Sequence, residues 1–182
     1  MFSHQINDDI VLRLYAPCHA KELFALADRN RDHLRPWLPW IESTRTVQDQ
    51  LGFIKAMRTK YGNGTDLAIG IWFQGELVGS IGLHRIDEHN KSAEIGYWLS
   101  ADAQGKGIMT RACRAVINHG FHDLGLNRIT IRVAPDNKAS RAIPERLAFV
   151  QEGILRQASA HYDGFIDLVF YGMLAAEWDA QS

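Results

Sequence analysis

The chain has 182 residues, of which 46% are hydrophobic, 23% charged and 10% aromatic. This length and composition suit one globular domain over residues 1–182, and they exclude a disordered chain or a pair of full nucleotide-binding domains. Twenty basic against 21 acidic residues give a net charge of −1. Such a chain has no overall field to attract phosphate backbones, so we expect no direct binding of nucleic acid.

Hydrophobic periodicity predicts a strand, two helices, three strands, a helix, a strand, a helix and two strands, in that order. An antiparallel meander followed by strand–helix–strand implies a mixed sheet with helices on its faces, which is an α/β (α+β) class of fold. The expected strands lie at 10–14, 67–73, 76–85, 93–99, 129–133, 150–161 and 165–174, and the expected helices at 20–30, 46–60, 105–124 and 137–147.

Three local sequence signals mark a helix start, a turn and an irregular segment between these elements. Thr46 and Asp49 have the spacing of a capping box at the start of the second helix. Gln74-Gly75 predicts a tight hairpin turn between two strands. Between the first two helices, two prolines fall within the five residues 36–40, which predicts irregular structure there.

The sequence predicts neither membrane attachment nor export. No apolar run approaches the roughly 18–20 residues of a membrane span, and the N-terminus lacks the basic start and apolar run of a secretory signal. Two cysteines, Cys18 and Cys113, make no disulfide framework. The eight histidines show no ligand spacing. We therefore expect a cytoplasmic protein without a metal site.

The most informative stretch is the passage from strand to helix at 97–110. Its loop, Gln104-Gly105-Lys106-Gly107, contains two glycines, which let the backbone approach a ligand closely. Unpaired N–H groups at a helix start attract a phosphate or pyrophosphate. An ordinary strand-to-helix turn is an equally simple interpretation of the two glycines.

Two familiar phosphate motifs fit this loop poorly. In a P-loop the lysine precedes a hydroxyl residue, whereas Lys106 lies between two glycines. The dinucleotide fingerprint needs a third glycine where this chain has Thr110. A Rossmann-type oxidoreductase is therefore a distant alternative.

The segment 104–110 resembles the acetyl-CoA pyrophosphate loop of the GCN5-related N-acetyltransferases, in the branch that acetylates the N-termini of ribosomal proteins. Three more segments resemble that branch: 93–99 its fourth strand, 126–129 its entry to strand five, and 137–147 its Asn-x-x-Ser-Arg-x-x-x-Glu helix. The order and spacing agree over most of the chain. One departure is Ala148 in place of the usual glycine after that helix, which predicts a slightly altered backbone there.

The resemblance implies a GNAT fold, with a splayed, mostly antiparallel sheet of six to seven strands and about four helices. It also implies a homodimer, and acetyl-CoA as a co-substrate whose pantetheine arm pairs with the fourth strand. The residues implied to hold the coenzyme are Tyr97, Trp98, Leu99, Gln104, Gly105, Lys106, Gly107, Ile108, Met109, Thr110, Asn137, Ser140 and Arg141.

The implied chemistry is the attack of a neutral amine on a thioester. A backbone N–H must meet the developing oxyanion, and the departing thiolate benefits from a proton donor. Ser140 is the candidate donor, Glu94 a candidate base acting through water, and His84 an assisting base. Structural interpretations also stay open for three of the named residues. Ser140 bonds to local backbone, Glu94 pairs with His84 or Arg85, and Asn137, one of the coenzyme candidates, caps its helix.

Trp37, Trp40 and Tyr162 are the candidate acceptor contacts, because aromatic walls can clamp the first residues of a peptide. Core or dimer packing is the alternative role for the rings of Trp37 and Trp40. The leading hypothesis is an acetyl-CoA-dependent N-acetyltransferase that acts on the N-terminal α-amine of a protein, including ribosomal proteins. Two alternatives stay open: transfer to a small amine such as a polyamine, amino acid or drug, and a non-catalytic CoA-binding domain.

Overall fold

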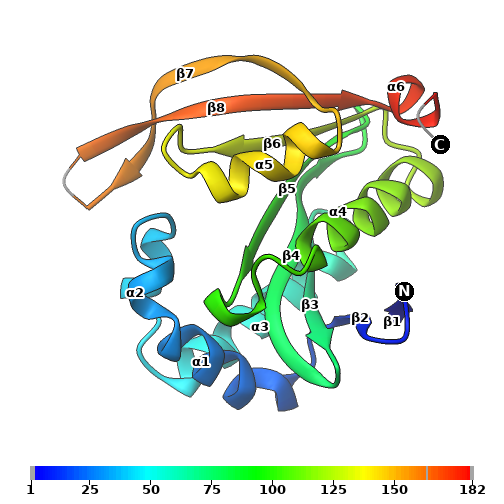
Figure 1. The fold of residues 1–182 in the computed structure, drawn as a ribbon. Helices are drawn as coiled ribbons and strands as arrows, with labels where there is room; N and C mark the ends of the chain where they lie inside the picture. The colour runs from blue at the N-terminus through cyan, green and yellow to red at the C-terminus, as the bar shows by residue number, and fades with distance from the viewer. Residues whose placement is uncertain (1–2, 163, 181–182) are drawn as a thin grey trace. The chain divides into compact units, whose positions relative to one another are not determined.

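The computed structural model describes residues 3–162 and 164–180 (Figure 1). In this part of the chain, neighbouring strands hydrogen-bond in the order β1-β2-β3-β4-β5-β6-β8-β7. The predicted mixed, mostly antiparallel sheet with flanking helices is confirmed. The sheet has eight strands instead of six or seven, because β1 (Ser3–Gln5) adds three residues to one edge. A strand that short carries too little periodicity to be predicted.

The chain divides into two compact units. The first comprises 1–82 and 97–112, and the second 83–96 and 113–182. Three elements contribute residues to both units: β4 (Glu76–Asp87), β5 (Ser92–Leu99) and α4 (Ile108–Asn118). The single domain over 1–182 stays a prediction.

In the first unit, α1 and α3 pack on β3. Their apolar side chains form a core with Tyr15 and Trp72, both of which are almost fully buried. β2 pairs antiparallel with β1 and with β3. The further elements of this unit are β2 (Ile10–Leu14), η1 (Pro17–His19), α1 (Ala20–Arg29), α2 (Arg31–Leu34), η2 (Pro39–Glu42), α3 (Val47–Gly62), β3 (Leu67–Phe73) and η3 (Ala101–Ala103).

Two of the local signals are confirmed. At the start of α3, the Asp49 amide donates to Thr46 Oγ1 over 3.2 Å, and the Thr46 amide donates to Asp49 Oδ2 over 2.8 Å. Gln74 and Gly75 have φ values of 52° and 87°. Positive φ at both central residues is the signature of the type I′ turn that suits a two-residue hairpin.

The prediction of irregular structure at 36–40 is partly wrong. A 3₁₀ helix, η2, begins at Pro39, and a short helix, α2, precedes the segment. Proline is well tolerated at the first position of a helix, where its missing N–H has no intrahelical acceptor in any case. The second proline therefore starts regular structure instead of preventing it.

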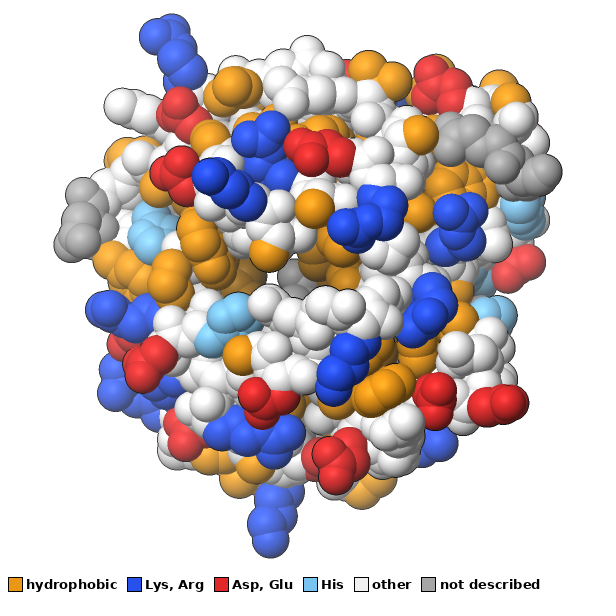
Figure 2. Space-filling view, in the orientation of Figure 1, with side chains coloured by type: hydrophobic (Ala, Val, Ile, Leu, Met, Phe, Trp, Pro, Cys, Tyr) orange, Lys and Arg blue, Asp and Glu red, His pale blue; other side chains and the backbone are white. Residues whose placement is uncertain are grey.

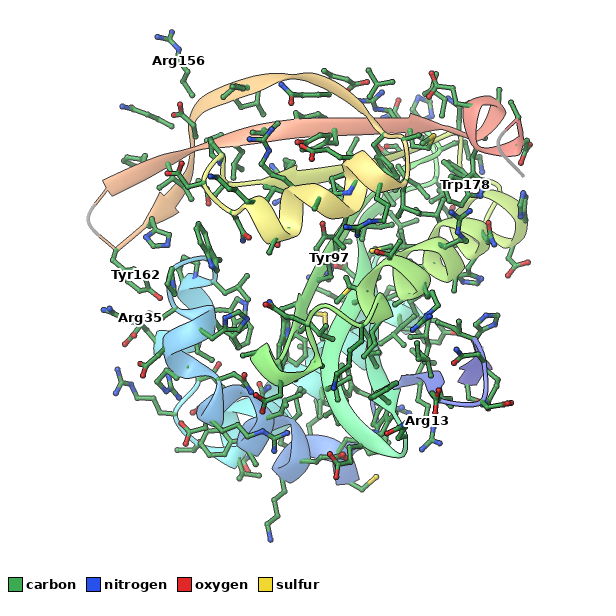
Figure 3. All side chains as sticks on the ribbon, in the orientation of Figure 1. Arg13, Arg35, Tyr97, Arg156, Tyr162 and Trp178 are labelled. Atoms are coloured by element: carbon green, nitrogen blue, oxygen red, sulfur yellow. The ribbon has the colours of Figure 1, made fainter. Side chains whose placement is uncertain are left out.

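In the second unit, the parallel pairing joins Ser92–Ile95 of β5 to Arg128–Ile131 of β6. β8 then pairs antiparallel with both β6 and β7. The indole of Trp178, buried in α6, donates to Asn118 Oδ1 over 2.6 Å (Figure 3). The further elements are β6 (Arg128–Val133), α5 (Lys138–Arg146), β7 (Val150–His161), β8 (Gly164–Leu174) and α6 (Ala175–Asp179).

The helix predicted at 105–124 is shorter in the structure. α4 begins at Ile108 and ends at Asn118, and a π-helical turn follows at His119–Asp123. The later start has a backbone cause, since Gly105 and Gly107 have φ values of 72° and 69°. Those values are incompatible with a right-handed helix.

The surface shows no strong bias of charge on the face seen in Figure 2. There, Lys and Arg side chains alternate with Asp and Glu, as expected from a net charge of −1. Across residues 3–162 and 164–180, no helix is both long and apolar enough to cross a membrane.

Candidate active site

The loop between β5 and α4 is open to solvent. Residues 104–107 are exposed, while the next two side chains, Ile108 and Met109, are buried and anchor the helix start. A Cβ atom added at Gly105 would meet nothing within 4 Å, and one at Gly107 only Arg111 Cζ at 4.0 Å. The φ values of 72° and 69° favour glycine at these two positions, and space remains beside them.

The first backbone hydrogen bond of α4 runs from the Arg111 amide to the Gly107 carbonyl over 3.2 Å. By helix geometry, the amides of Ile108 and Met109 have no acceptor within the helix. Amides gathered at a helix start in this way form a site for an anion such as a pyrophosphate.

Two cations lie at this loop. Arg111 donates from Nη2 to the carbonyl of Lys106 over 2.9 Å, which ties the helix back onto the loop. The ammonium of Lys106 lies 5.4 Å from the ring centroid of Phe73 on β3. Lys106 was a predicted coenzyme residue, whereas Arg111 was not. Its position four residues after the second glycine of the loop is the signal that could have identified it.

Tyr97, Trp98 and Leu99 form the end of β5, on which Figure 3 labels Tyr97. The next residue, Ser100, donates its amide to the Val78 carbonyl over 2.8 Å. Leu99 is buried, and Trp98 is half-buried against two hydrophobic clusters of the first unit. These contacts hold the end of β5 in place before the loop 104–107.

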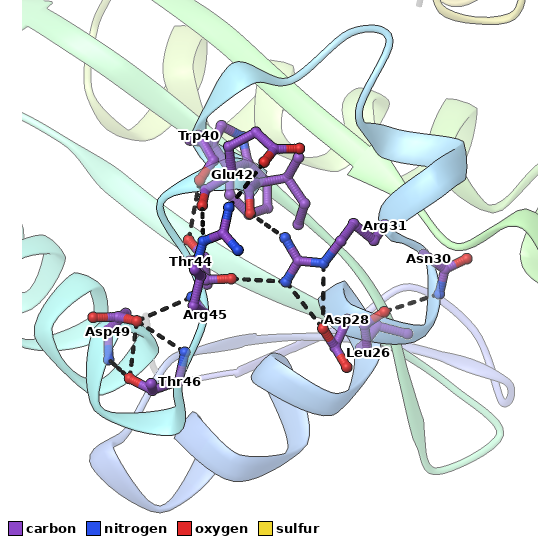
Figure 4. Close-up of polar contacts among 11 residues, drawn as sticks. Leu26, Asp28, Asn30, Arg31, Trp40, Glu42, Thr44, Arg45, Thr46 and Asp49 are labelled. Carbon is purple, nitrogen blue, oxygen red and sulfur yellow. Dashed lines mark hydrogen bonds and ion pairs between the residues drawn. The ribbon is translucent and has the colours of Figure 1, made fainter.

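Arg31 organises the segment that carries the predicted acceptor residue Trp40 (Figure 4). Its guanidinium donates to the carbonyls of Ile41 and Thr44, the latter over 2.8 Å, and to Asp28 Oδ1 over 2.9 Å. α2 is thereby tied to α1, to η2 and to the chain that follows η2. Trp40 packs against a cluster that includes Ile41, so part of its predicted packing role is confirmed.

Two further arginines, Arg35 and Arg45, form ion pairs with Glu42 in the same segment. Arg35 Nε lies 2.7 Å from Glu42 Oε1, and Arg45 Nη2 lies 3.1 Å from Oε2. The hydrogen bond from Arg35 is the main cause that lowers the pKa of Glu42.

The predicted acceptor residue Trp37 is half-buried, and its amide donates to the Leu34 carbonyl over 3.0 Å.

In the second unit, Glu94 takes part in two ion pairs. Arg85 Nη1 lies 3.0 Å and Arg132 Nη2 2.5 Å from Glu94 Oε2. The pairing with Arg85 was the structural interpretation of this residue, and it is confirmed. The imidazole of His84 lies over the backbone of β5, because a Cβ atom added at Gly96 would approach it to 3.1 Å.

The helix α5 begins with the cap that was predicted for it. Asn137 Oδ1 accepts the Ser140 amide over 3.1 Å, and Ser140 is half-buried. Arg141 donates to Tyr171 Oη over 3.0 Å and to the Pro135 carbonyl over 3.2 Å. The bond to Tyr171 is the main cause that raises the pKa of Arg141.

Tyr162 directly follows β7 (Figure 3), and its ring centroid lies 4.5 Å from that of His161 in an edge-on arrangement.

The candidate site residues are divided between the two units. The first unit holds the loop, the end of β5 and the two tryptophans. The second holds Glu94, His84, Tyr162 and the start of α5. In the described ranges, no three His, Cys, Asp or Glu side chains are placed to share a metal ion.

Comparisons with known proteins identify the family of this chain. Residues 9–150 match the family described as "Acetyltransferase (GNAT) domain". The chain therefore belongs to the GNAT family of acetyltransferases, and the predicted family is confirmed. It is 38% identical to "Putative ribosomal N-acetyltransferase YdaF" of Bacillus subtilis (strain 168), over 100% of both chains.

Two solved structures are similar to this chain in fold and sequence. One is the ribosomal L7/L12 alpha-N-protein acetyltransferase RimL in complex with coenzyme A, with a TM-score of 0.91 and 26% identity over 95% of this chain and 98% of that one. The other is the Microcin C7 self immunity acetyltransferase MccE in complex with acetyl-CoA and AMP, with a TM-score of 0.89 and 32% identity over 93% of this chain and 94% of that one.

Proposed function

We propose that this protein transfers the acetyl group of acetyl-CoA to the N-terminal α-amine of a protein, with ribosomal proteins as the first candidates. The observation that carries the proposal is the loop of two positive-φ glycines that opens α4. A related B. subtilis protein is named a putative ribosomal N-acetyltransferase, and a structural neighbour is named an alpha-N-protein acetyltransferase. Both names support an α-amine acceptor.

In this proposal, the amides of 104–110 hold the pyrophosphate of the coenzyme. Lys106 and Arg111 add positive charge beside it, which strengthens binding of a dianionic group. The pantetheine arm lies along Tyr97, Trp98 and Leu99 as an added strand. Asn137, Ser140 and Arg141 contribute from α5.

The reaction forms a C–N bond and breaks the C–S bond of the thioester. The neutral amine attacks the carbonyl carbon, and the developing oxyanion accepts a backbone N–H. The amine proton leaves through water towards Glu94, whose Oε1 takes part in neither ion pair. Ser140 donates its hydroxyl proton to the departing thiolate and recovers a proton from water, and His84 assists as a base.

The acceptor segment of the proposal contains Trp37 and Trp40, and Tyr162 adds a third aromatic ring. Rings of this size bury a large area against the first residues of a peptide. The homodimer and the cytoplasmic location stay predictions, as does the absence of a metal.

The test is a thiol-release assay with acetyl-CoA and a series of short peptides that differ only in their first residue. Each peptide has an N-terminally blocked twin as its control, and a polyamine and free amino acids complete the series. We expect release with unblocked peptides and none with the blocked twins. Release with small amines alone would assign a small-molecule acceptor. Coenzyme binding without release from any amine would favour a non-catalytic CoA-binding domain.

A further inference from the structure

Three contacts within the first unit join the segment 20–42, here called the acceptor arm, to the coenzyme elements. The amide of Ala101, just after β5, donates to Asn30 Oδ1 over 3.0 Å. His33 Nε2 lies 3.1 Å from Gln104 Nε2, in a side-chain hydrogen bond. The ring of Trp40 lies 6.0 Å from that of Trp98 on β5. The arm therefore contacts three successive parts of the chain, which are the end of β5, the start of η3 and the loop.

The Asn30 contact is rigid. The side chain is only 6% exposed, and its other end donates from Nδ2 to the Leu26 carbonyl over 2.9 Å. Both ends of the amide are thus used, one within the arm and one at the start of η3. A buried amide with both ends paired resists movement, because displacing it would leave buried polar atoms unsatisfied.

The His33 contact reaches the coenzyme loop itself. Gln104 is the exposed first residue of that loop, so its side chain would otherwise sample several rotamers. His33 is half-buried on α2, and α2 is held by the bonds of Arg31 to the Ile41 and Thr44 carbonyls. α2 thus presents the imidazole to a side chain of the loop, and the contact restricts both partners.

We infer that His33 is a positioning residue: by holding Gln104, it couples the acceptor arm to the pyrophosphate loop, so that coenzyme binding orders the arm. The inference rests on the proposed function, because it takes the loop as the coenzyme site. Coupling of this kind is reciprocal. An arm that is ordered by the coenzyme raises the affinity for the coenzyme in return.

A double-mutant cycle tests the inference, with His33→Ala, Gln104→Ala and the double variant. The readout is the Kd for coenzyme A by calorimetry. One hydrogen bond changes affinity by about 2- to 10-fold, so we expect each single variant to bind that much more weakly. The double variant should bind no more weakly than Gln104→Ala. His33→Gln, which keeps a hydrogen-bonding group, should recover part of the loss.

A second measurement separates coupling from a general structural defect. Amide hydrogen exchange at residues 31–44 is followed with and without saturating coenzyme A. In the parent protein and in the control His89→Ala, which alters an exposed turn, the coenzyme should slow exchange. In His33→Ala that slowing should be lost.

The failure of the inference and the failure of the proposed function are distinct. If the parent binds coenzyme A but the losses of the two single variants multiply, or His33→Ala keeps both its affinity and its exchange pattern, His33 has no coupling role. If the parent does not bind coenzyme A at all, the proposed function fails and the inference fails with it.

Discussion

The rings of Trp40 and Trp98 lie 6.0 Å apart, with their planes inclined at 52°. Trp40 comes from η2, and Trp98 from the strand that precedes the coenzyme loop. Trp98 also packs against the core formed by α1, α3 and β3. One side chain therefore connects the acceptor arm, the core and the proposed pantetheine strand.

Replacing Trp40 by Ala removes this ring contact and part of the cluster around Ile41. Because Trp40 is only half-buried, we expect a loss of about 1–3 kcal/mol in the free energy of unfolding, below the 3–5 kcal/mol typical of fully buried large side chains. In steady-state assays, the acceptor KM should rise by about 10-fold or more. Trp40→Phe is the matched control and should restore most of both losses. An unchanged acceptor KM in Trp40→Ala would exclude a role in acceptor binding.

Much of the fold could be predicted because its signals are local. The strand predicted at 150–161 has the bounds of β7 in the structure, and the Thr46–Asp49 spacing gives the start of α3. The start of α4 was misplaced because periodicity does not register the positive φ of two glycines. Strand β1 was missed because three residues carry no pattern.

The candidate site was only partly predictable. The loop 104–107 has a motif, whereas His33 contacts Gln104 of this loop, and Asn30 contacts Ala101 just before it, from some 70 positions away in the sequence. No spacing in the sequence indicates such contacts, since they depend on how α1 and α2 pack. Arg132 was likewise missed as a partner of Glu94, because it follows from the register between β5 and β6.

Gly107→Ala tests the conformation of the coenzyme loop. With φ at 69°, an alanine there costs about 1–2 kcal/mol, and we expect affinity for coenzyme A to fall by about 10-fold as the loop shifts. Gly125→Ala is a matched control, because its φ is 63° and nothing lies within 4 Å of an added Cβ. The control should lose similar stability and keep its affinity. Equal Kd values for the two variants would refute the assignment of the loop.

Ala148→Gly should stabilise the protein. Ala148 follows α5 with φ at 57°, its amide donates to the Glu145 carbonyl, and the Phe149 amide donates to the Pro144 carbonyl. These two bonds form a Schellman motif, whose left-handed position favours glycine. We expect a gain of about 0.5–1 kcal/mol in the free energy of unfolding. Ala56→Gly, exposed within α3, is the control and should lose about 1 kcal/mol.

Asp49 should make the stability of α3 depend on pH. Hydrogen bonds lower the pKa of its carboxyl below the ordinary 3.8, with the Arg45 amide as the largest cause. A lowered folded-state pKa stabilises the folded protein above 3.8, and this contribution is lost as the pH falls through the folded value. Asp49→Asn should therefore be less stable than the parent at pH 7 by chemical denaturation, and the difference should shrink below about pH 4. A difference that stays constant down to pH 2.5 would contradict this account.

Ser140→Ala tests the proton donor directly. Asn137 Oδ1 caps α5 by accepting the Ser140 amide, and this bond survives the substitution, so the helix keeps its cap. If the hydroxyl protonates the departing thiolate, kcat should fall by about 100-fold, while the Kd for coenzyme A changes less than about 3-fold. Asn137→Ala is the reciprocal control: it removes the cap and keeps the hydroxyl, so it should cost about 1 kcal/mol of stability with a smaller loss of kcat. A kcat of Ser140→Ala equal to that of the parent would remove Ser140 from the mechanism and leave residue 140 with a backbone amide that Asn137 caps.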